Sequence, residues 1–270
     1  GSIPVSGDQY LRYGGDTTCI EITARTGQSI IVDAGTGIRE LGNSLIERNI
    51  TSYHLLFTHA HWDHILGFAF FRPLQYRQAT LVIQERNFSR HVTSDILGQV
   101  MQAPFFPIGL NDLKADIQFD KSLNNRFAIG SIQVETIGTS HTGGGLGYRF
   151  TEDQASFVFL TDNELGFSHP GGRSFDDYVD FSRDADLLFH DSEYTADEYK
   201  RKLSWGHSSV QDVLELALKA NVRQVGLFHI NQDRTDDQMD AIVARSTAAL
   251  RQKSSAMDCF AVPCLFQTRL

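Results

Sequence analysis

The chain of 270 residues alternates between short apolar runs and segments whose apolar residues recur at helical spacing. Runs of about four to eight apolar or β-branched residues predict strands. They occur at residues 17–22, 29–32, 53–57, 79–83, 131–137, 155–160, 224–228 and 259–266. Because strands and helical segments alternate and no repeat or low-complexity linker divides the chain, we expect one α/β domain over residues 1–270.

Helical spacing is clearest in three segments, at residues 38–46, 210–218 and 235–253. Ser208 with Gln211 fits a capping box at the start of the middle segment. A further apolar run at residues 65–71 predicts the start of a buried helix, which Arg72-Pro73 is expected to end.

One stretch concentrates candidate metal ligands. The residues Thr58-His59-Ala60-His61-Trp62-Asp63-His64 directly follow the apolar run that ends in Leu-Leu-Phe. In an extended loop alternate side chains share a face, so His59 and His61 can reach one metal while Asp63 and His64, past the bend, reach another. The spacing therefore predicts two metals.

Other candidate ligands stand at the ends of predicted strands, where α/β sheets place their sites. They are His141, Asp162 and His229. Asp33, which also ends a strand, either caps the glycine turn that follows or supports the histidine loop. Glu164 is expected to be solvated, and His169 and Arg173 lie in a Gly/Pro-rich loop, where they are candidates for substrate contact.

The composition excludes some partners and leaves others open. A net charge of −9 disfavours general nucleic-acid binding, which needs clustered Lys and Arg, and favours a small substrate. No apolar run is long enough to span a membrane and no secretory signal is visible, so we expect a cytoplasmic protein that does not bind membranes. Three cysteines without a CxxC pair fit buried thiols.

The strand-end ligands make a coherent set for two cations. His59, His61 and His141 suit the first site, Asp63, His64 and His229 suit the second, and Asp162 can bridge them. Imidazole and carboxylate without thiolate favour Zn²⁺, although Mn²⁺ or Fe also accept such ligands. Two cations about 3.5–4 Å apart lower the pKa of a shared water and stabilise the attacking and leaving oxygens of an ester, so the predicted chemistry is hydrolysis.

On these residues the chain resembles the metallo-β-lactamase superfamily over nearly its whole length. The HxHxDH loop, the Asp33-Ala34-Gly35 turn and the later His141, Asp162 and His229 follow that family's order. The resemblance implies a four-layer αββα sandwich with a dimetal site at one edge of its two sheets. It leaves the substrate open, because thioester hydrolases, lactonases, phosphodiesterases and some iron oxygenases share the signature.

Two downstream motifs narrow the resemblance. His190-Asp191-Ser192 and Gly206-His207-Ser208 are similar to the His-Glu-Ala-Thr and His-Ser-Thr segments of the ribonuclease Z branch. The resemblance implies that Asp191 orients His207, which then acts as general acid or transition-state stabiliser, and that Asp63 takes part in catalysis as well as in metal binding.

The same resemblance disfavours transfer RNA as substrate. The tRNA-binding arm of that branch is generally inserted between the residues that match His141 and Asp162, and only 21 positions separate them here. The segments Gly1-Ser2-Ile3-Pro4 and Tyr13-Gly14-Gly15-Asp16-Thr17 are similar to the opening of smaller bacterial phosphodiesterase-like members.

The sequence thus favours a dimetal phosphodiesterase acting on a small or cyclic phosphodiester. It leaves the oligomeric state open, and a homodimer is one possibility because relatives often dimerise. Two alternatives stay open. One is a thioester or lactone hydrolase using the same metals, and the other is an iron-dependent redox or oxygen sensor.

Overall fold

The structure, a computed structural model, describes residues 1–88, 90–122 and 124–270. The chain forms two compact units. The first, called here the motif unit because it carries the histidine loop, consists of Asp16–Ile132, and the C-terminal unit consists of Gly1–Gly15 with Gln133–Leu270.

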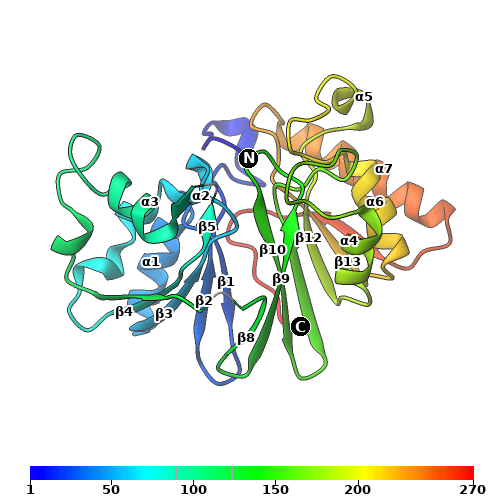
Figure 1. Ribbon diagram of the computed structural model, residues 1–270. Coiled ribbons are helices and arrows are strands. Elements are labelled where there is room, and N and C mark those ends of the chain that lie inside the picture. The colour runs from blue at the N-terminus through cyan, green and yellow to red at the C-terminus, as the bar shows by residue number, and fades with distance from the viewer. Residues whose placement is uncertain (89, 123) are drawn as a thin grey trace. The chain divides into compact units, whose positions relative to one another are not determined.

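The motif unit is built on a mixed sheet with the strand order β1-β2-β3-β4-β7 (Figure 1). The first two strands form a hairpin, since β1 pairs antiparallel with β2, and the remaining neighbours are parallel. The strands are β1 (Ile20–Thr23), β2 (Ser29–Val32), β3 (Ser52–Leu56), β4 (Thr80–Gln84) and β7 (Asp116–Asp120). Parallel β2 and β3 therefore end at the same edge, one in Asp33 and the other in the histidine loop.

Helices and short strands complete the motif unit. Its core joins Ile38 and Leu45 of α1 to Ile31 and Leu55 of the sheet, which is why the apolar positions of this helix recur at helical spacing. The remaining elements are α1 (Ile38–Glu47), α2 (Trp62–Ile65), η2 (Phe68–Phe70), η3 (Arg72–Gln75), β5 (Asn87–Phe88), β6 (His91–Val92), α3 (Thr93–Val100), η4 (Leu110–Asp112) and β8 (Arg126–Ile129).

The apolar run at residues 65–71 differs from its prediction. The helix α2 begins earlier, at Trp62, and stops at Ile65, and a separate 3₁₀ turn follows at Phe68–Phe70. Arg72-Pro73 does not end a helix but begins the turn η3, where proline occupies one of the first two positions. Proline is favoured there because those positions need no hydrogen-bonded N–H.

The C-terminal unit has a second mixed sheet, in which β14-β13-β12-β11 are parallel neighbours and β11-β10-β9 are antiparallel. The strands expected at residues 155–160 and 224–228 are confirmed. The closing strand expected at residues 259–266 is shorter. The strands are β9 (Ile132–Thr139), β10 (Gly145–Glu152), β11 (Ala155–Leu160), β12 (Leu187–Asp191), β13 (Gln224–Phe228) and β14 (Asp258–Ala261).

Helices α4, α6 and α7 lie together on one side of this second sheet (Figure 1). Their buried apolar residues, such as Val179, Val213 and Ile242, share one core with Val158 and Leu188 of the strands. The helices of the unit are η1 (Asp8–Tyr10), α4 (Phe175–Ser182), α5 (Ala196–Tyr199), α6 (Val210–Lys219) and α7 (Asp236–Gln252).

The cap of α6 was predicted one residue too early. Ser209, not Ser208, is the N-cap, and its hydroxyl accepts a hydrogen bond from the backbone N–H of Asp212. The Ser208 hydroxyl instead donates to the carbonyl of Asn163 and accepts from the N–H of Leu165. Adjacent serines offer the same local signal, so only the distant partner of Ser208 distinguishes them.

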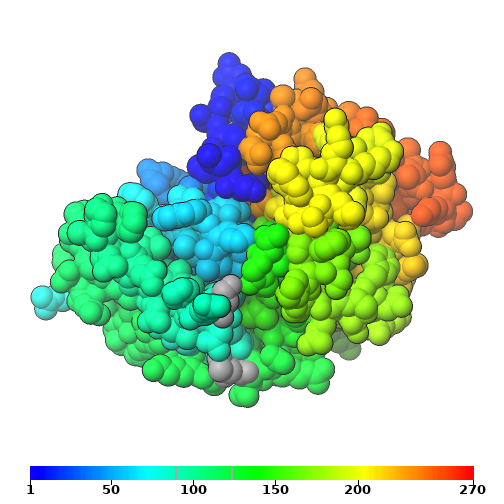
Figure 2. Space-filling model, turned by 45° about the horizontal axis from the view of Figure 1, so that its top comes forward, coloured from blue at the N-terminus to red at the C-terminus, as the bar shows by residue number. Residues whose placement is uncertain are grey.

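The N-terminal segment is tied to α7. The backbone N–H groups of Arg12 and Tyr13 donate to the carboxylate of Asp236, and the Tyr13 hydroxyl donates to Asp240 at 2.6 Å. In Figure 2 the blue N-terminal atoms accordingly lie against the orange atoms of this region. Among the described residues, no helix is both long and apolar enough to cross a bilayer.

Candidate metal centre

The histidine loop of the motif unit gathers its imidazoles directly after β3. The ring centroid of His59 lies 4.1 Å from that of His64 and 4.5 Å from that of His61. His59, Asp63 and His64 are buried, whereas His61 is exposed and caps the short helix α2. The bend predicted between His61 and Asp63 is the start of this helix, so the loop brings its four candidate ligands to one place within the unit.

Asp33 supports the histidine loop. Its Oδ2 lies 2.8 Å from Nδ1 of His64 and accepts a hydrogen bond from the Thr58 hydroxyl, while its Oδ1 accepts from the Thr58 N–H at 2.7 Å. Asp33 was predicted either to cap the glycine turn that follows it or to support the histidine loop, and its contacts are those of the second alternative. A carboxylate on Nδ1 fixes the imidazole so that Nε2 is the ligating nitrogen, and Nε2 of His64 faces Asp63 at 3.1 Å.

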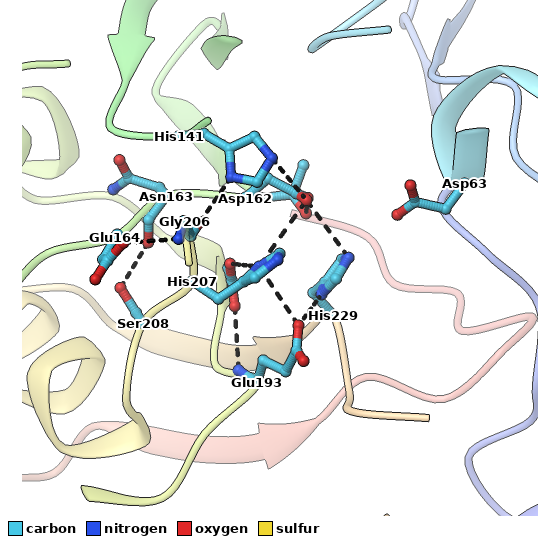
Figure 3. A network of polar contacts seen from close by, with 12 residues as sticks. Asp63, His141, Asp162, Asn163, Glu164, Glu193, Gly206, His207, Ser208 and His229 are labelled. Carbon is cyan, nitrogen blue, oxygen red and sulfur yellow. Dashed lines mark hydrogen bonds and ion pairs between the residues drawn. The ribbon is translucent and has the colours of Figure 1, made fainter. Parts of the chain in front are cut away.

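The C-terminal unit contributes a second cluster, centred on Asp162 (Figure 3). Asp162 Oδ1 lies 3.7 Å from Nε2 of His141 and 3.5 Å from Nε2 of His229. Two ligands on one tetrahedral Zn²⁺, each about 2.0–2.2 Å from the metal, lie roughly 3.3–3.6 Å apart. The three side chains thus have the donor types and the spacing of metal ligands.

The histidines of this cluster are also oriented through Nδ1. Nδ1 of His141 lies 2.8 Å from the carbonyl oxygen of Gly206, and Nδ1 of His229 lies 3.2 Å from Oε2 of Glu193 (Figure 3). In both rings the engaged Nδ1 directs Nε2 toward Asp162. Such partners are typical of metal-binding histidines, so the residues present fit divalent metal ions.

Three of the residues at strand ends have left-handed backbone conformations. The φ angles are 63° at Asp33, 50° at Asp162 and 53° at His229. This conformation costs a non-glycine residue of the order of 1 kcal/mol or more, and such strain concentrates at functional sites. In each unit the left-handed conformation turns the chain just after a strand. The turn places the side chain of the residue at the edge of the sheet.

His207 and Asp191 form the pair that the resemblance implied. Nδ1 of His207 lies 2.6 Å from Oδ2 of Asp191, which is fully buried at the end of β12. Burial lowers the pKa of His207, but the charge and hydrogen bond of Asp191 outweigh it and raise the pKa above its ordinary value. His207 is thereby suited to hold a proton, and its ring stacks on that of His229 with centroids 4.7 Å apart.

Glu193 is a residue of this site that the sequence analysis missed. Its Oε2 lies 3.2 Å from Nδ1 of His229 and 3.5 Å from Nδ1 of His207, and its Oε1 accepts from the Asn231 side chain. Burial raises the pKa of Glu193, but the hydrogen bond and charge of His229 bring it down to about 2. The signal was its position two residues after Asp191, because alternate residues of an extended segment share a face.

One expectation for the loop after Asp162 was wrong, and a second residue of this loop is buried. Glu164, expected to be solvated, is 1% exposed, and it accepts hydrogen bonds from Tyr199, Ser204 and Gly206. His169, a candidate for substrate contact, is buried with Nε2 2.8 Å from Oε2 of Glu164. Three of the donors to Glu164 lie 35 to 42 positions away, so no local pattern reveals its burial.

The gap between His141 and Asp162 is a tight hairpin. Strands β10 and β11 fill it and pair from Tyr148 opposite Phe159 to Glu152 opposite Ala155, so this segment contains no inserted arm.

Comparison with known proteins identifies the family. The family model described as "Beta-lactamase superfamily domain" matches residues 28–230. The chain belongs to this superfamily. Ribonuclease Z of Haloarcula marismortui is a relative, 24% identical over 259 residues that cover 77% of this chain and 78% of the relative. The HxHxDH loop and the motifs around Asp191 and His207 predicted the ribonuclease Z-related branch of the superfamily, and these matches confirm it.

Solved structures agree on the fold. The metallo-β-lactamase-fold protein YhfI from Bacillus subtilis has a TM-score of 0.68 at 15% identity, covering 98% of this chain and 94% of its own. A structure described as a new diphosphatase from the PhnP family has a TM-score of 0.64 at 20% identity, covering 98% of this chain and 88% of its own. The α/β metallo-β-lactamase fold class is therefore confirmed, and the protein is a metal-dependent hydrolase of this superfamily.

Proposed function

We propose that this protein is a phosphodiesterase that hydrolyses a small or cyclic phosphodiester with the help of two Zn²⁺ ions. The observation that carries the proposal is the His207–Asp191 pair, with its 2.6 Å contact, next to the His229 and Asp162 side chains. The relatives are named as a ribonuclease and a diphosphatase, and both names describe cleavage of bonds to phosphorus, which supports phosphorus over carbon as the reacting centre.

The proposed ligand set is the one expected from the sequence. His59, His61, Asp63, His64, His141, Asp162 and His229 hold the metals, and Asp63 also takes part in catalysis. The engaged Nδ1 atoms of His64, His141 and His229 support their assignment. When bound, the metals supply Lewis acidity and activate water.

The residues of the chain supply the remaining chemistry. Asp191 holds the His207 ring with Nδ1 toward itself, so that Nε2 is the atom that gives a proton to the departing oxygen. The Glu193 carboxylate adds negative charge 3.5 Å from the same Nδ1, which favours the protonated ring. Removing the leaving-group proton transfer raises the barrier most when the leaving group is a strong base.

A small substrate is preferred to transfer RNA. The net charge of −9 disfavours binding of an extended polyanion, and the His141–Asp162 segment is a hairpin without an arm. We further propose that residues 1–270 act as one hydrolase domain, because the ribonuclease Z relative aligns over 77% of the chain. A cytoplasmic location and a homodimer are part of the same proposal and rest on the resemblance alone.

The test is a substrate panel with zinc-, manganese- and iron-loaded protein. We expect turnover of bis(p-nitrophenyl) phosphate and of cyclic nucleotides, with thioesters and lactones left intact. Cleavage of thioesters alone would support a thioester hydrolase instead, and iron with a visible absorption band but no turnover would support a sensor. The control variant is Asp186→Asn. Asp186 precedes β12 and accepts a hydrogen bond from the Ser156 N–H at the start of β11, whereas Asp191, the partner of His207, stands at the other end of β12.

A further inference from the structure

Glu164 is a buried acidic side chain with four hydrogen-bonding contacts near the proposed ligands of the C-terminal unit. Its Oε1 accepts from the Tyr199 hydroxyl and the Ser204 N–H, both at 2.7 Å. Its Oε2 accepts from the Gly206 N–H at 2.7 Å and lies 2.8 Å from Nε2 of His169. A buried carboxylate with four donors is a rigid acceptor, because each lone-pair direction has a partner.

The donors of Glu164 belong to the segment that delivers two site residues. Its two backbone donors, Ser204 and Gly206, flank a single residue, so the carboxylate fixes the backbone on both sides of Trp205. The next residue along the chain is His207. The carbonyl of Gly206, whose N–H Glu164 holds, is also the group that engages Nδ1 of His141 (Figure 3).

The fit between Gly206 and His141 leaves little tolerance. Gly206 has φ of 95°, and a Cβ added to it would lie 2.3 Å from Nδ1 of His141. The imidazole thus packs directly on the backbone, and a small shift of residue 206 changes both the direction of the ring and its hydrogen bond. Only a fixed backbone keeps Nε2 of His141 aimed at Asp162.

The residue before Glu164 makes the same connection. The carbonyl of Asn163 accepts from the Ser208 hydroxyl at 2.6 Å, and its side-chain Oδ1 accepts from the Ser140 N–H at 2.8 Å, next to His141. The segment that follows β11 and carries Asp162 is therefore hydrogen-bonded to the residue before His141 and to the residue after His207.

We infer that Glu164 is a positioning residue for the metal centre, acting through Gly206 on His141 and through the same segment on His207. The inference rests on the ligand set of the proposed function. The positioning role requires both oxygens of the carboxylate, since each accepts one backbone N–H. A glutamine has the same shape but only one oxygen. In either orientation its NH₂ group faces a donor, the N–H of Ser204 or that of Gly206.

The test is the zinc affinity of folded protein, measured by competition with a chromogenic chelator, together with kcat and KM for bis(p-nitrophenyl) phosphate. We expect Glu164→Gln to weaken zinc binding roughly 10- to 100-fold and to lower kcat with little change in KM, the range found when partners of metal-binding histidines are replaced. Asp186→Asn removes a partly buried carboxylate that also accepts a backbone N–H, far along the sheet from the site, and is expected to bind zinc as the wild type does.

Two results decide the matter. Wild-type zinc affinity in folded Glu164→Gln, or an equal loss in Asp186→Asn, overturns the inference. If Glu164→Gln does not fold, Tyr199→Phe, which removes one donor at 2.7 Å, takes its place. We expect it to weaken zinc binding roughly 2- to 10-fold, and an unchanged affinity overturns the inference. The affinity needs no substrate, so a protein that binds zinc tightly but leaves phosphodiesters intact contradicts the proposed function and not this inference.

Discussion

Replacing Asp191 by asparagine isolates the proposed proton transfer from metal binding. Asp191 is fully buried, with one oxygen 2.6 Å from Nδ1 of His207 and the other accepting the Glu193 N–H at 3.1 Å. Asparagine keeps the shape and loses the negative charge. Since Asp191 is not among the proposed ligands, we expect the variant to retain its metals, as measured by inductively coupled plasma mass spectrometry.

The size of the effect follows from the kind of contact that is lost. A hydrogen bond to a charged group contributes about 1.5–3 kcal/mol. If this energy stabilises the protonated His207 in the transition state, its loss lowers kcat roughly 10- to 150-fold. The loss also brings down the raised pKa of His207, so the alkaline limb of the pH profile, where the general acid gives up its proton, moves to lower pH.

The leaving group supplies the decisive comparison. p-Nitrophenolate departs with little help from an acid, whereas an alkoxide needs a proton. We therefore expect Asp191→Asn to damage the hydrolysis of an alkyl diester much more than that of bis(p-nitrophenyl) phosphate. Equal losses on both substrates with full metal content would refute the role of His207 as proton donor, and so would an unshifted alkaline limb.

Three further outcomes test the centre and the fold around it. Asp162→Ala is expected to lose both its metal and its turnover. His207→Ala is expected to keep its metal and lose its turnover. Metal analysis together with a kinetic assay measures both quantities. Asp33→Asn is expected to weaken metal binding roughly 10- to 100-fold in a chelator competition, because Asp33 orients His64 through a 2.8 Å contact. Leu216→Ala is expected to lower the free energy of unfolding in urea by about 2–5 kcal/mol without changing metal content, since Leu216 is fully buried among the helices of the C-terminal unit.

The sequence predicted the parts of the fold that depend on local pattern. The strands at residues 155–160 and 224–228 have the predicted limits, since apolar runs bounded by polar residues leave little choice of boundary. Asp33 was correctly placed at a strand end, but its partner His64 lies 31 positions away and could only be offered as one of two alternatives.

Residues that depend on distant partners were not predictable in this way. Glu164 looks like an ordinary polar residue of a loop, yet three of its four donors lie 35 to 42 positions downstream and help to bury it. Ser208 and Ser209 offer the same capping side chain, and the carbonyl of Asn163, 45 positions away, decides which of them caps α6. Local propensity cannot contain this information, because it arises only when the sheet brings these segments together.

The partner of each Nδ1 atom orients the imidazole and influences how readily the ring holds a proton. A carboxylate partner makes an imidazole more basic, whereas a backbone carbonyl only accepts the N–H of a neutral ring. His141 has the carbonyl of Gly206, which suits a neutral ligand, and His207 has the carboxylate of Asp191, which suits a ring that carries a proton. The carboxylate alone does not decide the task, because the proposed ligands His64 and His229 also have one at Nδ1, from Asp33 and Glu193. His207 differs in having two carboxylates near the same Nδ1, those of Asp191 at 2.6 Å and Glu193 at 3.5 Å, and their combined charge favours the ring that carries a proton.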